Sequence, residues 1–108
     1  MNQYSIIFIT TSNIKEAKSI GNALLKARLV ACVNIVNCIE SLFWWQGKID
    51  KAREALLIIK TRKRLFSKIS KLVKKNHSYQ TPEIISFPLE NIDPGYRRWL
   101  DATILKSH

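Results

Sequence analysis

Glycine is scarce in this 108-residue chain, and long apolar runs are missing. The three glycines stand singly, so the chain has no glycine-rich phosphate loop and no GxGxxG dinucleotide fingerprint. No apolar run approaches the ~18 uncharged residues that a membrane-spanning helix needs. No pattern of a nucleophile with its general base stands out either. We therefore expect neither a membrane span nor catalytic activity.

Cysteine is equally scarce, and its two copies are poorly placed for a disulfide. Cys32 and Cys38 lie on one predicted strand, where even spacing gives them the same face and about 20 Å between them. A disulfide needs Cα atoms within ~7 Å, and the spacing is not that of a CxxC motif. We interpret both as buried structural thiols in a reducing compartment. The first residues also lack a basic region followed by a small-residue cleavage site, which favours the cytoplasm.

Acidic residues are few, with 8 Asp and Glu against 18 Lys and Arg and a formal net charge of +10. Residues 60–75 hold eight Lys or Arg and no acid, which is compatible with the solvated face of one helix. Binding to nucleic acid or to acidic lipid is the alternative interpretation. An RNA-recognition module needs paired aromatics on its two central strands, where this chain offers only Phe8. We expect no specific nucleic acid, only weak retention that vanishes near physiological salt and has no biological role.

One long hairpin dominates the pattern of predicted elements. Its arms cover residues 30–45 and 48–60, and the turn falls at Gln46 and Gly47. The first arm would reach about 50 Å if extended. A compact domain of this length is roughly 35 Å across. The hairpin therefore either bends sharply or leaves the domain to pair with another subunit, and the exposed pair Trp44 and Trp45 at its tip favours a subunit contact.

The remaining elements complete a single domain over residues 1–108. A buried strand over residues 5–10 is followed by a helix that begins with Asn13 and Glu16 as a capping box. Thr61 is predicted to cap a second helix. A strand over residues 83–87 and a short helix after Pro94 follow, and the helices carry apolar stripes at Ile14, Ala17, Ile20, Leu24, Ala27, Leu65, Ile69, Leu72, Val73, Tyr96, Trp99, Leu100 and Ile104.

The order strand, helix, strand, strand, helix, strand, helix predicts an α+β, ferredoxin-like fold. Such a fold has one antiparallel sheet with two helices on one face, here with an additional C-terminal helix and a long protruding hairpin between the second and third strands. Many unrelated functions use this fold, so the activity has to be argued from the site.

Candidate site residues are a lone histidine and a set of polar side chains. His77 lies in a polar loop, where it is either a surface residue or a ligand in a weak metal site, since a strong site needs three or four convergent ligands. Glu54 interrupts an apolar strand, on the same face as Lys60 and about 20 Å away. Charges of this kind either discourage strand aggregation or line a cleft between subunits. The predicted inter-subunit cleft comprises Glu54, Lys60, Tyr79, Glu83 and Trp99.

Several blocks of the sequence resemble the CutA family of divalent-cation tolerance proteins, in the order in which that family has them. They are residues 31–34 (Ala-Cys-Val-Asn), residues 41–49 (Ser-Leu-Phe-Trp-Trp-Gln-Gly-Lys-Ile), Glu54 with Leu57, Lys60 and Thr61, residues 77–84 (His-Ser-Tyr-Gln-Thr-Pro-Glu-Ile) and residues 96–100 (Tyr-Arg-Arg-Trp-Leu). Together they cover the chain from about Tyr4 to Leu105.

The resemblance implies a ferredoxin-like homotrimer in which long hairpins exchange strands between subunits, with Trp44 and Trp45 at the interface. It also implies a role in tolerance of divalent metal ions, copper among them, with weak metal binding. The positions of a copper site described in the family are here Ile9, Asn76 and His77, so only His77 supplies a metal ligand. An alternative implied function is that of a trimeric scaffold or small-molecule sensor similar to the PII signalling proteins, acting through inter-subunit clefts.

Overall fold

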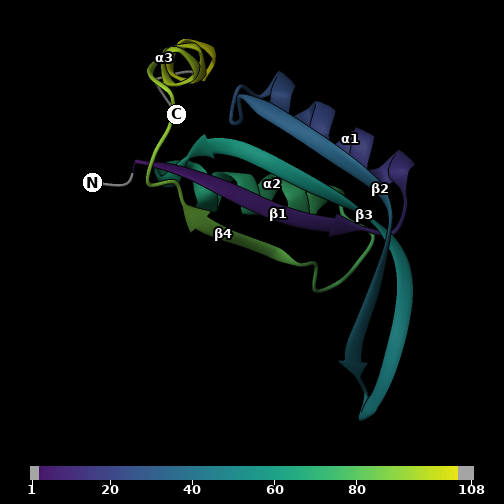
Figure 1. Ribbon diagram of the computed structural model, residues 1–108. Helices are drawn as coiled ribbons and strands as arrows, with labels where there is room; N and C mark the ends of the chain where they lie inside the picture. The colour runs from purple at the N-terminus through teal and green to yellow at the C-terminus, as the bar shows by residue number, and fades with distance from the viewer. Residues whose placement is uncertain (1–2, 105–108) are drawn as a thin grey trace.

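The computed structural model describes residues 3–104 and forms one four-stranded antiparallel sheet in the order β2-β3-β1-β4. Two helices, α1 and α2, cover one face of this sheet, and α3 lies beyond its end (Figure 1). The elements are β1 (Tyr4–Thr11), α1 (Ile14–Lys26), β2 (Cys32–Trp45), β3 (Lys48–Arg62), the 3-10 helix η1 (Lys63–Leu65), α2 (Phe66–Asn76), β4 (Ile84–Pro88) and α3 (Pro94–Thr103). The predicted α+β, ferredoxin-like order is confirmed. Residues 1–2 and 105–108 of the predicted domain lie outside the described residues.

The core lies between the sheet and the two helices that cover it. Alternate residues of β1, such as Ile7 and Ile9, are fully buried against α1 and α2. Burial of each such side chain contributes about 1.5–3 kcal/mol. Helix α1 begins after the predicted cap, because the Asn13 side chain accepts a hydrogen bond from the Glu16 backbone N at 2.8 Å. The other half of the predicted capping box differs, because the Glu16 carboxylate accepts from the Ser12 backbone N rather than from that of Asn13.

The start of α2 differs from the prediction that Thr61 caps it. Strand β3 continues to Arg62, and Thr61 is a fully buried strand residue whose Oγ1 donates to the Leu29 carbonyl at 2.7 Å. A hydroxyl that is used in this way inside the sheet is not available to cap a helix. The chain instead passes through η1, and α2 begins at Phe66 without a side-chain cap.

The hairpin of β2 and β3 turns at Gln46 and Gly47, which have φ values of 50° and 78°. Positive φ at both central residues is typical of the type I′ turn that suits the twist of a hairpin. The outer half of the hairpin leaves the sheet and extends well away from it (Figure 1). This extension makes the molecule elongated, with dimensions of 44 × 26 × 22 Å.

A β-bulge divides the hairpin and overturns the interpretation of the cysteines. The register of β2 shifts between Val36 and Ile39, so the strict alternation that placed Cys32 and Cys38 on one face is interrupted. Cys38 is exposed and has φ 59°, and Cys32 is only partly buried. The prediction that both thiols are buried is therefore wrong. Both are free cysteines, as predicted.

Helix α3 is attached to the sheet mainly through Asp101. The Asp101 carboxylate forms an ion pair with Arg62 at 2.6 Å and accepts a hydrogen bond from the Tyr4 hydroxyl at 2.8 Å. The Arg62 guanidinium also lies 5.3 Å from the centre of the Tyr4 ring. Arg28 adds a bond to the Thr103 carbonyl at 3.2 Å. These contacts fix one end of α3 beside the first residues of β1.

Candidate functional site

A cluster of polar side chains lies where β1 ends and the outer hairpin begins. Glu54 is 8% exposed and stands one residue beyond the last pair of β1 with β3, Thr11 with Ala55. The Tyr79 hydroxyl donates to Glu54 Oε2 at 2.9 Å. At Glu54, β3 is paired only with β2, through Ile39. The interpretation that its charge discourages strand aggregation stays a prediction, and its carboxylate holds the loop between α2 and β4.

His77 connects that loop to β1 through both of its ring nitrogens. Nδ1 accepts a hydrogen bond from the Tyr79 backbone N at 3.0 Å, and Nε2 lies 2.7 Å from the Thr10 carbonyl oxygen. An amide donor on one side and a carbonyl acceptor on the other select the neutral tautomer with the proton on Nε2. The rings of His77 and Tyr79 also lie 4.9 Å apart.

A second carboxylate, that of Glu16, holds the same loop from the side of α1. Its Oε2 accepts from the Ser78 backbone N at 2.7 Å, and its Oε1 accepts from the Ser12 backbone N at 2.9 Å. Burial alone would raise the pKa of Glu16, but these hydrogen bonds from Ser12 and Ser78 outweigh it and lower the pKa. The loop is thus held by α1, β1 and β3 together.

The environment of Tyr79 favours the neutral phenol. Burial is the largest cause, followed by the hydrogen bond to Glu54 and the negative charges of Glu54 and Glu16, and together they raise the pKa of Tyr79 to about 12. Tyr79 therefore stays a hydrogen-bond donor throughout the physiological range. The cluster as built positions backbone and side chains and offers no activated nucleophile.

A second group of contacting side chains, which includes the predicted cleft residues Lys60 and Trp99, lies near the other end of the sheet, beside α3. Lys60 Nζ is 3.9 Å from Cys32 Sγ, and burial together with the neighbouring Cys32 raises the pKa of Tyr96. Tyr96 in turn packs at 5.3 Å on the ring of Trp99. These residues form an aromatic and cationic surface rather than a closed cavity.

Within one chain, the five residues that were predicted to line one cleft lie in separate places. Glu54 and Tyr79 are in contact, whereas Lys60 and Trp99 belong to the group beside α3 and Glu83 is exposed before β4. The inter-subunit cleft that was predicted to unite them stays a prediction. Thr10 and Ser78 were not predicted from the sequence. They take part through the Thr10 carbonyl and the Ser78 backbone N, and backbone atoms leave no signal in the sequence.

Side chains that could bind a metal ion are not clustered in the described part of the chain. Residues 3–104 contain no group of three or more His, Cys, Asp or Glu that could hold a metal. Ile9 is fully buried in the core, the Asn76 side chain donates to the Leu72 carbonyl at 2.8 Å, and both His77 nitrogens have backbone partners. The residues at the three family positions therefore do not fit a copper site within one chain.

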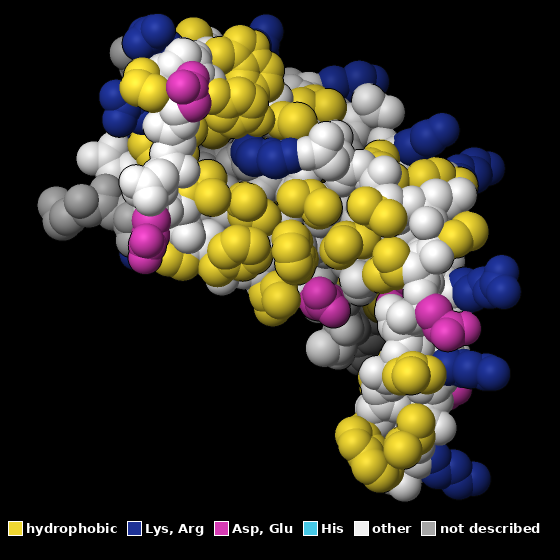
Figure 2. Space-filling model, viewed as in Figure 1, with side chains coloured by type: hydrophobic (Ala, Val, Ile, Leu, Met, Phe, Trp, Pro, Cys, Tyr) yellow, Lys and Arg dark blue, Asp and Glu magenta, His cyan; other side chains and the backbone are white. Residues whose placement is uncertain are grey.

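Apolar side chains gather on the face of the sheet opposite the helices, which we call the open face (Figure 2). Among residues 3–104, all but one of the large exposed apolar side chains belong to β2, β3, β4 or α3; Leu25 of α1 is the exception. They are Val36, Leu42, Phe43, Trp44, Trp45, Ile49, Ile85, Phe87, Tyr96 and Trp99. The helical face contributes almost nothing to this set.

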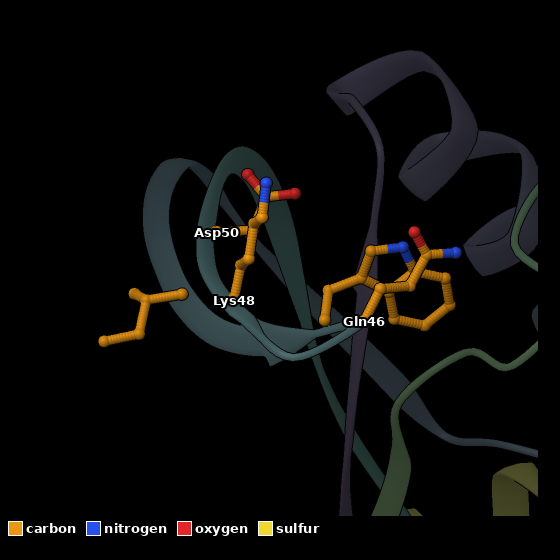
Figure 3. Close-up of a pocket in the computed structure, with 5 residues that line it drawn as sticks. Gln46, Lys48 and Asp50 are labelled. Atoms are coloured by element: carbon orange, nitrogen blue, oxygen red, sulfur yellow. The ribbon is translucent and has the colours of Figure 1, made fainter.

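The outer hairpin carries the most exposed members of this set, which are Trp44 at 73%, Leu42 at 70%, Ile49 at 68% and Trp45 at 57%. A shallow hollow at the tip is lined by Trp45, Gln46, Lys48, Ile49 and Asp50. Figure 3 shows Lys48 and Asp50 extending from the returning strand while Gln46 marks the turn. The hollow combines the apolar side chains of Trp45 and Ile49 with the polar groups of Gln46, Lys48 and Asp50. A mixed surface of this kind suits contact with another protein.

These features define a small ferredoxin-like α+β protein with an extended hairpin and a broad apolar sheet face. Comparison with known families is more specific, because the model of the CutA1 divalent ion tolerance protein matches residues 5–103. The chain belongs to this CutA1 family. No helix of the described residues is long and apolar enough to cross a membrane.

Two relatives illustrate how closely the chain follows the family. It is 42% identical to the divalent-cation tolerance protein CutA of Archaeoglobus fulgidus, covering 94% of this chain and 98% of that protein. It is 40% identical to the chloroplastic protein CutA 1 of Oryza sativa subsp. japonica, where the match covers 94% of this chain but 58% of the plant protein. The chain therefore spans little more than half the length of that relative.

Solved CutA structures from Oryza sativa and Archaeoglobus fulgidus agree with the fold. The CutA1 structure from Oryza sativa superimposes with a TM-score of 0.94 at 36% identity, covering 97% of this chain and 96% of that one. The structure from Archaeoglobus fulgidus, which is described as a periplasmic divalent cation tolerance protein, gives a TM-score of 0.90 at 42% identity over 93% and 97% of the two chains. The expectation of a cytoplasmic location for the present chain stays a prediction.

Proposed function

We propose that this chain acts in divalent-cation tolerance as a homotrimeric scaffold without catalytic activity. The observation that supports the proposal is the one-sided distribution of exposed apolar side chains on the open face and the hairpin. Monomeric soluble proteins rarely expose so extensive an apolar surface, and an oligomer buries it. In the proposed trimer the open faces meet at the centre, and the basic helices face outward.

The hairpin completes this assembly. Its outer half has no partner strand in the described chain beyond the hairpin itself, and its exposed Trp44 and Trp45 are suited to a neighbouring subunit. The bulge between Val36 and Ile39 is where the outer half departs from the sheet. Packing of the tip on a neighbour would bring its hollow and the Glu54 cluster of adjacent chains to the subunit boundary.

Inter-subunit clefts are then the proposed place where the protein responds to a ligand. Glu54 and Tyr79 lie at the base of the hairpin, so a ligand bound in a cleft there would contact the segment that determines where the hairpin tip lies. The relatives are named tolerance proteins, and those names describe no enzyme. We propose a scaffold or sensor in which binding at the cleft changes contacts between subunits, with no bond made or broken.

Weak binding of copper or another divalent metal through His77 stays a prediction. The imidazole would have to exchange a backbone hydrogen bond for a metal, and one nitrogen ligand does not complete a transition-metal site. Further ligands would have to come from another subunit or from solvent. Cleft binding and His77 binding are separable, because the first needs the trimer and the second needs the imidazole.

Alanine at both Trp44 and Trp45 tests the scaffold proposal. The variant should lower the fraction of trimer in light scattering at micromolar concentration, since it removes two large exposed aromatics from the tip. Lys74→Ala, on α2 and therefore on the helical side that faces outward in the proposed trimer, is the control and should leave the mass unchanged. A wild-type protein that is a stable monomer would overturn the proposal.

A further inference from the structure

The helical side of the molecule, opposite to the apolar open face, is rich in exposed lysine. Helices α1 and α2 with η1 carry eight exposed lysines, which are Lys15, Lys18, Lys26, Lys63, Lys68, Lys71, Lys74 and Lys75. We call this set the lysine layer. None of its members takes part in an ion pair within residues 3–104, where the pair of Arg62 with Asp101 is the salt bridge present.

Acidic side chains are almost absent from the same surface. Glu16 is the single Asp or Glu in α1, η1 and α2. Its two carboxylate oxygens accept hydrogen bonds from Ser12 and Ser78, so it faces inward and compensates no lysine. The positive charge of the chain is therefore concentrated on one side, which produces a strong local field.

The lysines form two rows, one on each helix. Lysines at spacing i, i+3 and i+7 share one face of a helix, as Lys68, Lys71 and Lys75 do on α2. Lys15 and Lys18 begin the corresponding row on α1. Helices α1 and α2 are in contact and cover the same face of the sheet, and packed helices lie about 8–10 Å apart, so the two rows lie on neighbouring helices.

We propose that the lysine layer is a docking surface for the phosphate backbone of double-stranded nucleic acid, bound without sequence preference. The layer has the cations that neutralise phosphates, and phosphate contacts carry no sequence information. Of the amides on its helices, Asn22 is exposed among the lysines of α1, and the Asn76 side chain donates to the Leu72 carbonyl. This inference goes beyond the tolerance role and does not depend on the trimer, because one chain carries the whole layer.

The absence of two other features favours a duplex over other polyanions. Single strands are held by bases stacked on aromatic rings, and Phe66, the one aromatic of α1 and α2, is packed against the core. Membrane surfaces are held by apolar side chains that enter the lipid, and Leu25, 38% exposed, is the one large apolar side chain exposed on these helices. Phosphate contact through lysines needs neither feature.

The sequence-based expectation of retention that vanishes near physiological salt rested on the overall charge of +10, without the placement of the lysines. The second row on α1 increases the number of phosphates within reach to about four to six. Each contact adds about −0.9 to the slope of log K against log salt, so a slope of about −4 to −5 is expected. Binding should remain measurable at roughly 150 mM salt.

Fluorescence anisotropy of the full chain with a labelled mixed-sequence DNA duplex, from about 50 to 300 mM KCl, tests the proposal. The variant Lys68→Glu with Lys71→Glu should bind at least about tenfold more weakly and reduce the salt slope by about 2, because two phosphate contacts are lost. The matched control is Arg97→Glu with Arg98→Glu on α3, which has the same change in net charge and should leave the slope unchanged. Glutamine at Lys68 and Lys71 repeats the test without reversing charge.

Three outcomes would overturn the proposal. The first is no duplex binding by the wild type at low salt. The second is an equal loss of affinity in the α2 variant and the α3 control, because long-range charge alone would then explain the binding. The third is stronger binding to single-stranded DNA of the same length or to phosphatidylserine vesicles than to the duplex.

Discussion

The Tyr79 hydroxyl donates to Glu54 Oε2 at 2.9 Å, and this bond joins the loop before β4 to the base of the hairpin. Glu54 is 8% exposed, so its charge has little access to water. A buried carboxylate that loses a donor is strongly penalised. The pair therefore links the conformation of the loop to the position of the hairpin.

Replacement of Tyr79 by Phe should lower the free energy of unfolding by about 1–3 kcal/mol, because Glu54 keeps its charge and loses its donor. Denaturant unfolding at a fixed protein concentration gives the value. Combining Tyr79→Phe with Glu54→Gln should cost less than the two single changes added together. Strictly additive costs would show that the hydrogen bond contributes nothing to stability.

The stability contributed by Tyr79 should depend on pH only in the alkaline range. Its folded-state pKa of about 12 lies above the ordinary value of 10.0, so the contribution is complete below pH 10.0 and is lost as pH rises through about 12. Ultraviolet absorbance of tyrosinate should show a late titration step that Tyr79→Phe removes. An unchanged titration in the variant would contradict this assignment.

Two buried hydroxyls in the sheet should respond in opposite ways to removal. Thr61→Val deletes the donor to the Leu29 carbonyl and should destabilise by about 1–2 kcal/mol. Ser5→Ala should be neutral or stabilising, because the buried Ser5 Oγ has no hydrogen-bond partner among the described residues. Thermal unfolding of the two variants beside the wild type measures both effects. A larger loss for Ser5→Ala than for Thr61→Val would contradict the assignment.

Calorimetry with copper tests the prediction for His77. A weak heat is expected in the wild type and should disappear in His77→Gln, which keeps a side-chain N–H donor for the Thr10 carbonyl but has no imidazole. His77→Ala, which loses the hydrogen bond as well, should behave in the same way toward copper and unfold more easily. Identical heats in all three proteins, or none in the wild type, would remove His77 as a ligand.

The fold was predictable because its signals are local and agree with one another. The capping pair Asn13 and Glu16, the turn at Gly47 and the apolar alternation around Ile7 each favour the same elements. The start of α2 was not predictable, because Thr61 can serve either as a cap or as a strand residue. Its choice depends on the Leu29 carbonyl, which is distant in sequence.

The site was predictable only in part, for a related reason. Glu54 and Tyr79 were predicted to line a cleft between subunits, which stays a prediction, and within one chain they form a hydrogen bond. The bulge after Val36 depends on pairing between strands, so the exposure of Cys38 could not be read from even spacing. The hydrogen bonds that engage His77 come from backbone atoms, which every residue supplies, and they left no mark in the sequence.

The central claim is that the exposed apolar side chains of one chain are buried in a homotrimer. Light scattering coupled to size-exclusion chromatography, at micromolar concentration and physiological salt, tests it most directly. The account predicts a mass three times that of the 12.5 kDa chain, with loss of that species when Trp44 and Trp45 are both replaced by alanine. A stable species with the mass of one chain, and with the same mass in the variant, would contradict it.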